Sequence, residues 1–154
     1  MKTLAIYAGS FNKFHIGHMN ILHKASEIFG EENIVVAIGC NPTKDTSDIQ
    51  NRLIYLSNRF VEIGIKSKVE VYFSFLHKFI EEKEKLGYNV ILVRGLRNGD
   101  DLSYENNQLS FIHDFKPDVK SVFIMCDKKY EHISSSSVRQ LESFSKGSSK
   151  NYII

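Results

Sequence analysis

The sequence has few cysteines, little net charge and no long apolar run, and each shortage excludes a class of protein. Its 154 residues include two cysteines, Cys40 and Cys126, which lie far apart and form no Cys-x-x-Cys pair. This usage excludes a disulfide-stabilised scaffold and is typical of reduced thiols in a cytosolic protein. No apolar run approaches membrane-spanning length, and the amino terminus enters a short strand without a signal-peptide core. We therefore expect a cytoplasmic protein with no membrane partner.

The formal net charge of +2 is too small to indicate a nucleic-acid-binding surface by itself. No internal repeat is visible, and the low-complexity patches are the serine run Ser134–Ser137 and the Ser/Lys-rich tail after Ser143. A chain of 154 residues is long enough to bury one core without disulfides or metal. We expect one domain spanning residues 1–154, less ordered after about residue 143, and no nucleic-acid partner.

Short β-branched runs recur along the chain and predict strands. They are Leu4–Ala8, Ile34–Ile38, Val69–Phe73, Val90–Val93 and Val122–Met125. Most are apolar throughout, as expected of parallel strands that are covered on both faces. Segments with helical spacing follow them, at residues 21–29, 53–60, 76–86, 102–112 and 138–141. Strands alternating with helices predict an α/β fold with a parallel sheet and right-handed crossovers.

Polar or glycine-containing clusters follow four of the predicted strands. They are Gly9–His18, Asn41–Lys44, Arg94–Arg97 and Tyr130–Arg139. The carboxyl ends of parallel strands meet at one edge of a sheet, and ligands bind there near the point where the strand order reverses. We therefore expect all four clusters to line one crevice.

The first cluster combines two glycines with two histidines at the start of a predicted helix. Such a turn binds phosphate through backbone N–H groups and the helix dipole. Gly9 allows close backbone approach, and the hydroxyl of Ser10 and the imidazole of His18 can each bind a phosphate. The pattern is neither Gly-x-Gly-x-x-Gly nor a Walker loop. Two other interpretations stay open: an ordinary strand–helix connection in which His15 and His18 lie on the surface, and a metal site, for which no third ligand is fixed nearby.

The third cluster places Arg94 and Arg97 on either side of Gly95, directly after a predicted strand. Arginine forks match phosphate oxygens, and the glycine allows backbone contact with a ligand. The alternative is a solvated pair of arginines that bind Asp100 and Asp101.

The remaining clusters contribute single polar groups. Lys44 adds a cation, Glu105 can bind an adenine amino group or a ribose, and Tyr130 can pack on a base. The hydroxyls of Ser134–Ser136 precede a helical segment and form a second anion site. As alternatives, the lysine is solvated, the glutamate favours a helix N-terminus, the tyrosine is a surface aromatic and the serines are a flexible N-cap.

Together these residues resemble a known enzyme superfamily. Gly-Ser-Phe followed by His-Ile-Gly-His is similar to the signature of the nucleotidyltransferases. The stretch Val93–Glu105, with Arg-Gly-Leu-Arg and Asp-x-x-Tyr-Glu, resembles the central motif of the phosphopantetheine adenylyltransferases, and Ile133–Arg139 resembles their third motif. The resemblance runs in register from about Leu4 to Leu141. It implies a Rossmann-like single domain with a five-stranded parallel sheet flanked by helices.

The resemblance also implies individual roles. ATP would be held by Ser10, Phe11, His15, His18, Gly95, Leu96, Arg97, Glu105, Tyr130, Ser134, Ser135 and Ser136. The acceptor 4'-phosphopantetheine would be held by Ser10, Lys44, Leu76, His77 and Arg94. The catalytic residues would be His18, Lys44 and Arg94. Mg²⁺ is expected as a nucleotide-bound ion with no protein ligands, because no carboxylate cluster is visible. A homo-oligomer, a hexamer by resemblance, is also implied.

One residue leaves the acceptor open. His15 stands where the family commonly has threonine, and related enzymes acting on other acceptors carry histidine there. The alternatives are adenylyl or cytidylyl transfer to another small phosphate acceptor such as nicotinamide mononucleotide, and an ATP-binding module without turnover. A class I aminoacyl-tRNA synthetase shares His-Ile-Gly-His, but 154 residues leave no room for tRNA-binding domains.

Overall fold

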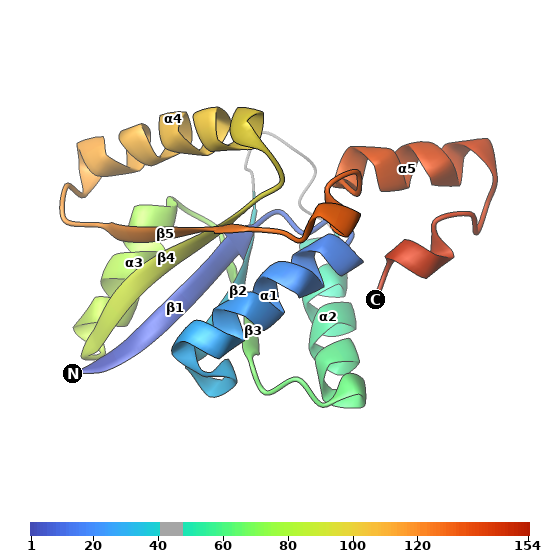
Figure 1. The fold of residues 1–154 in the computed structure, drawn as a ribbon. Helices are drawn as coiled ribbons and strands as arrows, with labels where there is room; N and C mark the ends of the chain where they lie inside the picture. The colour runs from blue at the N-terminus through green and yellow to red at the C-terminus, as the bar shows by residue number, and fades with distance from the viewer. Residues whose placement is uncertain (41–47) are drawn as a thin grey trace.

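A computed structural model describes residues 1–40 and 48–154 and contains a sheet covered by helices on both faces (Figure 1). The strands are β1 Lys2–Gly9, β2 Ile34–Gly39, β3 Lys68–Tyr72, β4 Tyr88–Leu96 and β5 Lys120–Met125. The α-helices are α1 Ile16–Phe29, α2 Ile49–Ile63, α3 Leu76–Lys85, α4 Gly99–Phe115 and α5 Ser135–Phe144. The 3₁₀ helices are η1 Glu31–Asn33, η2 Lys128–Tyr130 and η3 Lys150–Tyr152. Every predicted strand and helical segment is present, with shifted bounds.

The strand order is β3-β2-β1-β4-β5, and each neighbouring pair is parallel. This confirms the predicted α/β Rossmann-like fold with a five-stranded parallel sheet. Within the described ranges, no helix combines the length and apolar character that crossing a bilayer requires.

Successive strand residues point to opposite faces of the sheet, and two helices cover each face. On one face, Tyr7 of β1 belongs to a core with Leu22 of α1 and Phe60 of α2. On the other face, Ile6 packs in a core with Phe79 of α3, and α4 adds only partly buried side chains. The sheet is therefore covered on both sides, which explains why its strands are apolar throughout.

β4 extends further than the sequence predicts. Arg94 and Gly95 were expected after the strand, but they lie within it, because the pairing with β5 continues to Leu96 opposite Met125. The sheet itself therefore positions Arg94, and Arg97 is the first residue after the strand.

The strand order reverses at β1, which pairs with β2 on one side and β4 on the other. The chain leaves β1 through α1 toward β2, and it leaves β4 through α4 toward β5, on the opposite face (Figure 1). Connections that diverge in this way open a crevice outside the carboxyl ends of the two strands.

The segment after α5 folds back onto the loop that precedes α1. The Ser149 hydroxyl of this segment donates to the carboxylate of Glu142 in α5 at 2.5 Å. Ile153 then forms an antiparallel bridge with His15. The end of the chain therefore helps to fix the backbone of the first histidine.

Gly95 generates a testable prediction about how closely β4 packs on α1. A Cβ atom at this position would lie 2.8 Å from Cγ1 of Ile21, which is buried. We expect G95A to lower the free energy of unfolding by about 1–3 kcal/mol, because the core has no room for the methyl group. Urea denaturation measures the change. G99A is the matched control, since its Cβ meets nothing within 4 Å. Equal losses in the two variants would contradict the packing account.

Candidate active site

A cavity of about 460 Å³ opens at the carboxyl edge of the sheet, beside the switch point. Its walls come from the start of α1, the end of β4, the start of α4 and the start of α5. We call it the histidine cavity, because His15 and His18 line it together. The clusters after β1, β4 and β5 therefore meet in one crevice, as the sequence predicts.

The two histidines cap the start of α1 reciprocally. His15 is the N-cap residue, and its Nδ1 accepts the backbone N–H of His18 at 3.3 Å. Nδ1 of His18 accepts the backbone N–H of His15 at 3.2 Å. The two rings are stacked, with centroids 3.6 Å apart and an interplanar angle of 14°. Because each Nδ1 is an acceptor, the proton of each neutral ring lies on Nε2.

Both imidazoles are neutral near pH 7. Burial, together with the cation of Arg97, lowers the pKa of His15 to about 4. Burial, His15 and Arg97 lower the pKa of His18 well below its ordinary value, against the opposing effect of a backbone hydrogen bond with Lys13. A neutral ring with Nε2–H can donate a hydrogen bond to an anion without adding charge to the cavity.

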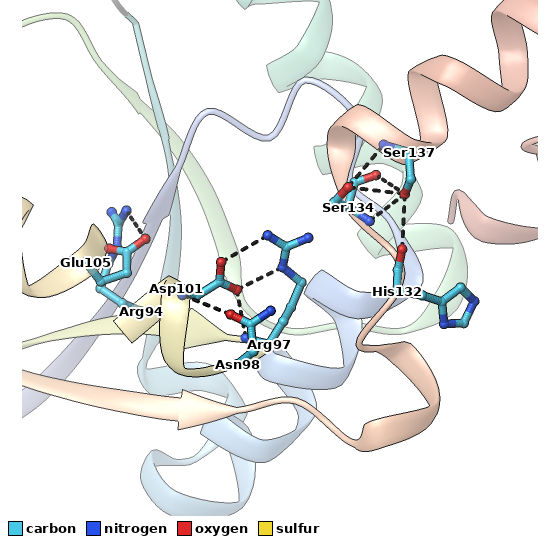
Figure 2. Close-up of polar contacts among 8 residues, drawn as sticks. All are labelled: Arg94, Arg97, Asn98, Asp101, Glu105, His132, Ser134 and Ser137. Atoms are coloured by element: carbon cyan, nitrogen blue, oxygen red, sulfur yellow. Dashed lines mark hydrogen bonds and ion pairs between the residues drawn. The ribbon is translucent and has the colours of Figure 1, made fainter. Parts of the chain in front are cut away.

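The start of α5 faces the same cavity and is also capped reciprocally. Ser134 accepts the backbone N–H of Ser137 at 3.0 Å, and the Ser137 hydroxyl accepts the backbone N–H of Ser134 at 2.8 Å (Figure 2). Ser135 and Ser136 follow in the first turn and line the cavity. A helix N-terminus with hydroxyls beside it favours an anion.

Arg97 adds a cation that is already paired. Its Nε and Nη2 donate to the Asp101 carboxylate at 2.8 and 3.0 Å, and Asp101 also accepts the backbone N–H of Arg97 (Figure 2). Asn98 caps α4 by accepting the Asp101 backbone N–H at 3.0 Å. A guanidinium carries five N–H groups, so the bidentate pair leaves others for a ligand.

Arg94 and Glu105 form a second bidentate pair. The distances are 2.7 Å for Nε–Oε2 and 3.0 Å for Nη2–Oε1 (Figure 2). Nη1 of Arg94 also donates to the Ala8 carbonyl at 3.2 Å. Glu105 lines the histidine cavity and a second cavity, which Arg94 also lines. The ion pair therefore stands between the two cavities.

The second cavity, of about 420 Å³, is mostly apolar, and we call it the aromatic cavity. The rings of Phe75, His77 and Phe115 are stacked on one another, with centroids 4.9 to 5.5 Å apart. Leu76 lines the same cavity. Arg94 and Glu105 are the charged groups in its lining among the described residues. The cavity suits a ligand with an apolar body and an anionic end.

Most residues that were predicted to hold ATP line the histidine cavity. They are His15, His18, Gly95, Leu96, Arg97, Glu105, Tyr130, Ser134, Ser135 and Ser136. Three residues predicted to hold the acceptor, Leu76, His77 and Arg94, line the aromatic cavity.

Ser10 and Phe11 line neither cavity. Ser10 is exposed, and its carbonyl accepts a hydrogen bond from Nη1 of Arg52 at 2.7 Å. Phe11 has a left-handed backbone, with φ 44°, and its ring is buried edge-on against Tyr7 and His18. Phe11 thus holds the imidazole of His18 in place through packing, and the roles of both residues toward ATP stay predictions.

Lys44 lies outside the described residues, so its predicted role toward the acceptor stays a prediction. In the ranges that the structure describes, no group of three or more His, Cys, Asp or Glu side chains is arranged to hold a metal ion.

The sequence analysis missed several lining residues. Tyr104 and Cys126 line the histidine cavity, and Phe111 and Phe115 line the aromatic cavity. The spacing of Phe111 and Phe115, four residues apart on a predicted helix, places both side chains on one face and was the available signal. Cys126 gave no such signal, because a lone cysteine is typically a core residue.

The neutral histidines predict how stability depends on pH. The unfolded chain takes up protons on these rings near pH 6.5, whereas folded His15 does so near pH 4, so the unfolded state binds more protons in between. We expect the free energy of unfolding to fall as the pH is lowered through this range, by up to roughly 3 kcal/mol for His15.

Urea denaturation at several pH values tests this expectation. H15N should show a shallower pH dependence, because it removes one of the groups. H23A, which changes an exposed histidine of α1, is the matched control and should keep the wild-type dependence. An equally steep pH dependence of the free energy of unfolding in H15N and the wild type would contradict the assignment of this dependence to His15.

Comparison with known proteins gives the family of the chain. The cytidylyltransferase-like family matches residues 6–141. A phosphopantetheine adenylyltransferase of Clostridium botulinum (strain Hall) is 31% identical over 144 residues, which cover 94% of this chain and 84% of the relative. One from Chromobacterium violaceum is 34% identical over 140 residues, which cover 89% and 80%. The chain belongs to the cytidylyltransferase-like family and is a nucleotidyltransferase.

Proposed function

We propose that the chain transfers the adenylyl group of ATP to 4'-phosphopantetheine, giving dephospho-coenzyme A and pyrophosphate in coenzyme A biosynthesis. The observation that carries the proposal is the Arg94–Glu105 ion pair, which stands between two cavities of different chemistry. One cavity offers imidazoles and two helix N-termini, which suit a nucleoside triphosphate. The other offers an apolar wall and an arginine, which suit a phosphate on a long organic arm. The names of the relatives support the same reaction.

ATP occupies the histidine cavity in this proposal. The N-termini of α1 and α5 and Arg97 bind the triphosphate, and Ser135 and Ser136 add hydroxyl donors. Gly95 and Leu96 of β4 line the cavity beside the nucleotide, and Tyr130 packs on the base. Ser10 and Phe11 contribute from the loop before α1.

The acceptor occupies the aromatic cavity. Arg94 binds its phosphate, and Leu76 and His77 contact the pantetheine arm. Ser10 and Lys44 complete the phosphate site. Because Arg94 lies in the wall between the cavities, the phosphate that it binds faces the nucleotide.

The reaction is an in-line displacement at the α-phosphorus. An acceptor phosphate oxygen forms a bond to this phosphorus as the bond to the bridging oxygen breaks, and pyrophosphate leaves with the electron pair. A phosphate nucleophile is largely ionised near neutral pH, so no covalent nucleophile or dedicated base is needed, and positioning and charge stabilisation suffice. The Nε2–H of His18 donates to the oxygen on which charge grows, while Lys44 and Arg94 orient the attacking phosphate.

Mg²⁺ enters as part of the nucleotide complex. Among the described residues, the carboxylates that line the cavity are those of Asp101 and Glu105, and each is engaged by an arginine, which fits an ion held mainly by phosphate oxygens. When bound, the ion neutralises charge on the leaving pyrophosphate.

The proposal includes a cytoplasmic homo-oligomer, a hexamer by resemblance, that has no nucleic-acid or membrane partner. Both cysteines are free thiols, in keeping with a reducing compartment. Helix α4 buries none of its residues fully. Its Phe111 and Phe115 side chains are more than half exposed. An interface between copies would cover such aromatic side chains.

The acceptor is tested by pyrophosphate release from ATP and magnesium with a panel of phosphate acceptors. We expect turnover with 4'-phosphopantetheine and none with nicotinamide mononucleotide. H18A should lower kcat by about 10²–10³-fold, because a donor to the developing charge is lost. Turnover with a different acceptor alone would support the alternative assignment, and ATP binding without any turnover would support a binding module.

The role of Arg94 is tested by R94K. Lysine cannot make the bidentate contact, so we expect KM for 4'-phosphopantetheine to rise by about 10–100-fold and KM for ATP to change much less. R59K is the matched control, because Arg59 forms a surface ion pair with Glu62 on α2, away from both cavities. Equal rises of both KM values in R94K would contradict the placement of the acceptor.

A further inference from the structure

We propose that His15 is a positioning residue that acts through His18: its ring caps the backbone of His18 and stacks on the His18 imidazole, which holds that imidazole in one orientation, while the backbone N–H of residue 15 selects its tautomer. The effect on catalysis rests on the proposed function, whereas the effect on the imidazole does not. The sequence motif alone suggests a direct contact between His15 and ATP, so the two roles need to be separated.

The reciprocal cap leaves little freedom to either ring. Each Nδ1 already accepts a backbone N–H, at 3.3 and 3.2 Å, so Nδ1 of His18 is not available to a ligand. A change of tautomer would place a proton on Nδ1 and set it against the backbone N–H of His15. The cap therefore selects Nε2–H as the donor that His18 offers.

The stack fixes the plane of the His18 ring. The ring centroid of His15 lies 3.6 Å from that of His18. The rings of Phe11 and Phe14 also pack against His18, with centroids 4.9 and 5.2 Å away. A Cβ at Gly17 would lie 3.0 Å from Cε1 of His15, so the glycine leaves the space that the His15 ring occupies. His15 is the polar member of this enclosure, and it supplies a hydrogen bond as well as packing.

The backbone of His15 is itself held. His15 bridges Ile153, and the Ile154 N–H donates to the Phe14 carbonyl at 3.2 Å. Ile153 and Ile154 belong to the segment that folds back after α5. These contacts fix the backbone of His15, and so they fix the position from which its ring caps His18.

The charged and titratable groups around the pair favour neutral rings. Arg97 faces both rings from the end of β4 and favours their neutral form, whereas a backbone hydrogen bond with Lys13 partly opposes this effect at His18. Asp101 is engaged by Arg97. The other titratable groups in the cavity lining are Tyr7, Tyr104, Glu105, Cys126 and Tyr130. Glu105 is engaged by Arg94, so neither carboxylate of the lining that the structure describes is left to stabilise an imidazolium.

Three substitutions separate the two contributions of His15. H15N keeps an acceptor for the cap but loses the stack, H15F keeps a flat ring but loses the acceptor, and H15A loses both. We expect kcat to fall by about tenfold or more in H15A and by less in H15N and H15F, with KM for ATP nearly unchanged. H23A, on the exposed side of α1, is the matched control.

A double-mutant cycle tests whether His15 acts through His18. We expect H15A to cost little further activity in an H18A background, because the group that it positions is absent. Equal losses in both backgrounds, or a rise in KM for ATP with kcat unchanged, would overturn the proposal in favour of a direct contact with ATP.

NMR of the His18 imidazole tests the positioning without turnover. We expect the Nε2–H tautomer of His18 in the wild type and in H15A, because the backbone N–H of residue 15 still donates to Nδ1. We expect the NOEs between the His18 and Phe11 rings to weaken in H15A, because the stacked ring is lost, and to recover partly in H15F. Unchanged His18–Phe11 NOEs in H15A would overturn the proposal. An inactive wild type would contradict the proposed function, and the NMR comparison would still decide the role of His15.

Discussion

The pairing of β1 with β2 on one side and β4 on the other is the constraint on which the site depends. Because the chain leaves these two strands toward opposite faces, the sheet edge opens between them. The close contact of Gly95 with Ile21 draws α1 toward β4, and this brings His18 near Arg97. The parallel pairing of β1 with β2 and β4 and the close packing at Gly95 thus form a crevice that can hold a nucleotide.

The charged side chains that the structure describes in this crevice are paired with one another. Arg94 and Arg97 each form an ion pair with a carboxylate of α4, so the orientation of both guanidinium groups is fixed. The histidines stay neutral, and the helix starts supply partial positive charge through their N–H groups. An anionic substrate therefore meets oriented donors. Such an arrangement stabilises a transition state with little reorganisation of the protein. The arrangement is consistent with the membership of the chain in a nucleotidyltransferase family.

The sequence predicts the fold because parallel strands covered on both faces leave apolar runs that recur between helical segments. It also predicts which clusters meet, since strand ends share one edge, and three of the four clusters lie in the described crevice. The partners within the site could not be predicted. The reciprocal cap of His15 and His18 depends on ring orientation, and the Arg94–Glu105 pair depends on how α4 packs over the sheet. The burial of Phe11 could not be predicted either, because it follows from a left-handed backbone that turns the ring into the core; its contact with ATP stays a prediction.

In the proposed reaction, the two cavities serve one direct transfer across the wall that Arg94 and Glu105 form. The configuration at the α-phosphorus distinguishes this transfer from a route through an adenylylated enzyme. With an ATP analogue that is chiral at this phosphorus, a single in-line displacement by the acceptor phosphate predicts a dephospho-coenzyme A product with inverted configuration. Retention of configuration would require a second displacement through an adenylylated enzyme, and it would contradict the account.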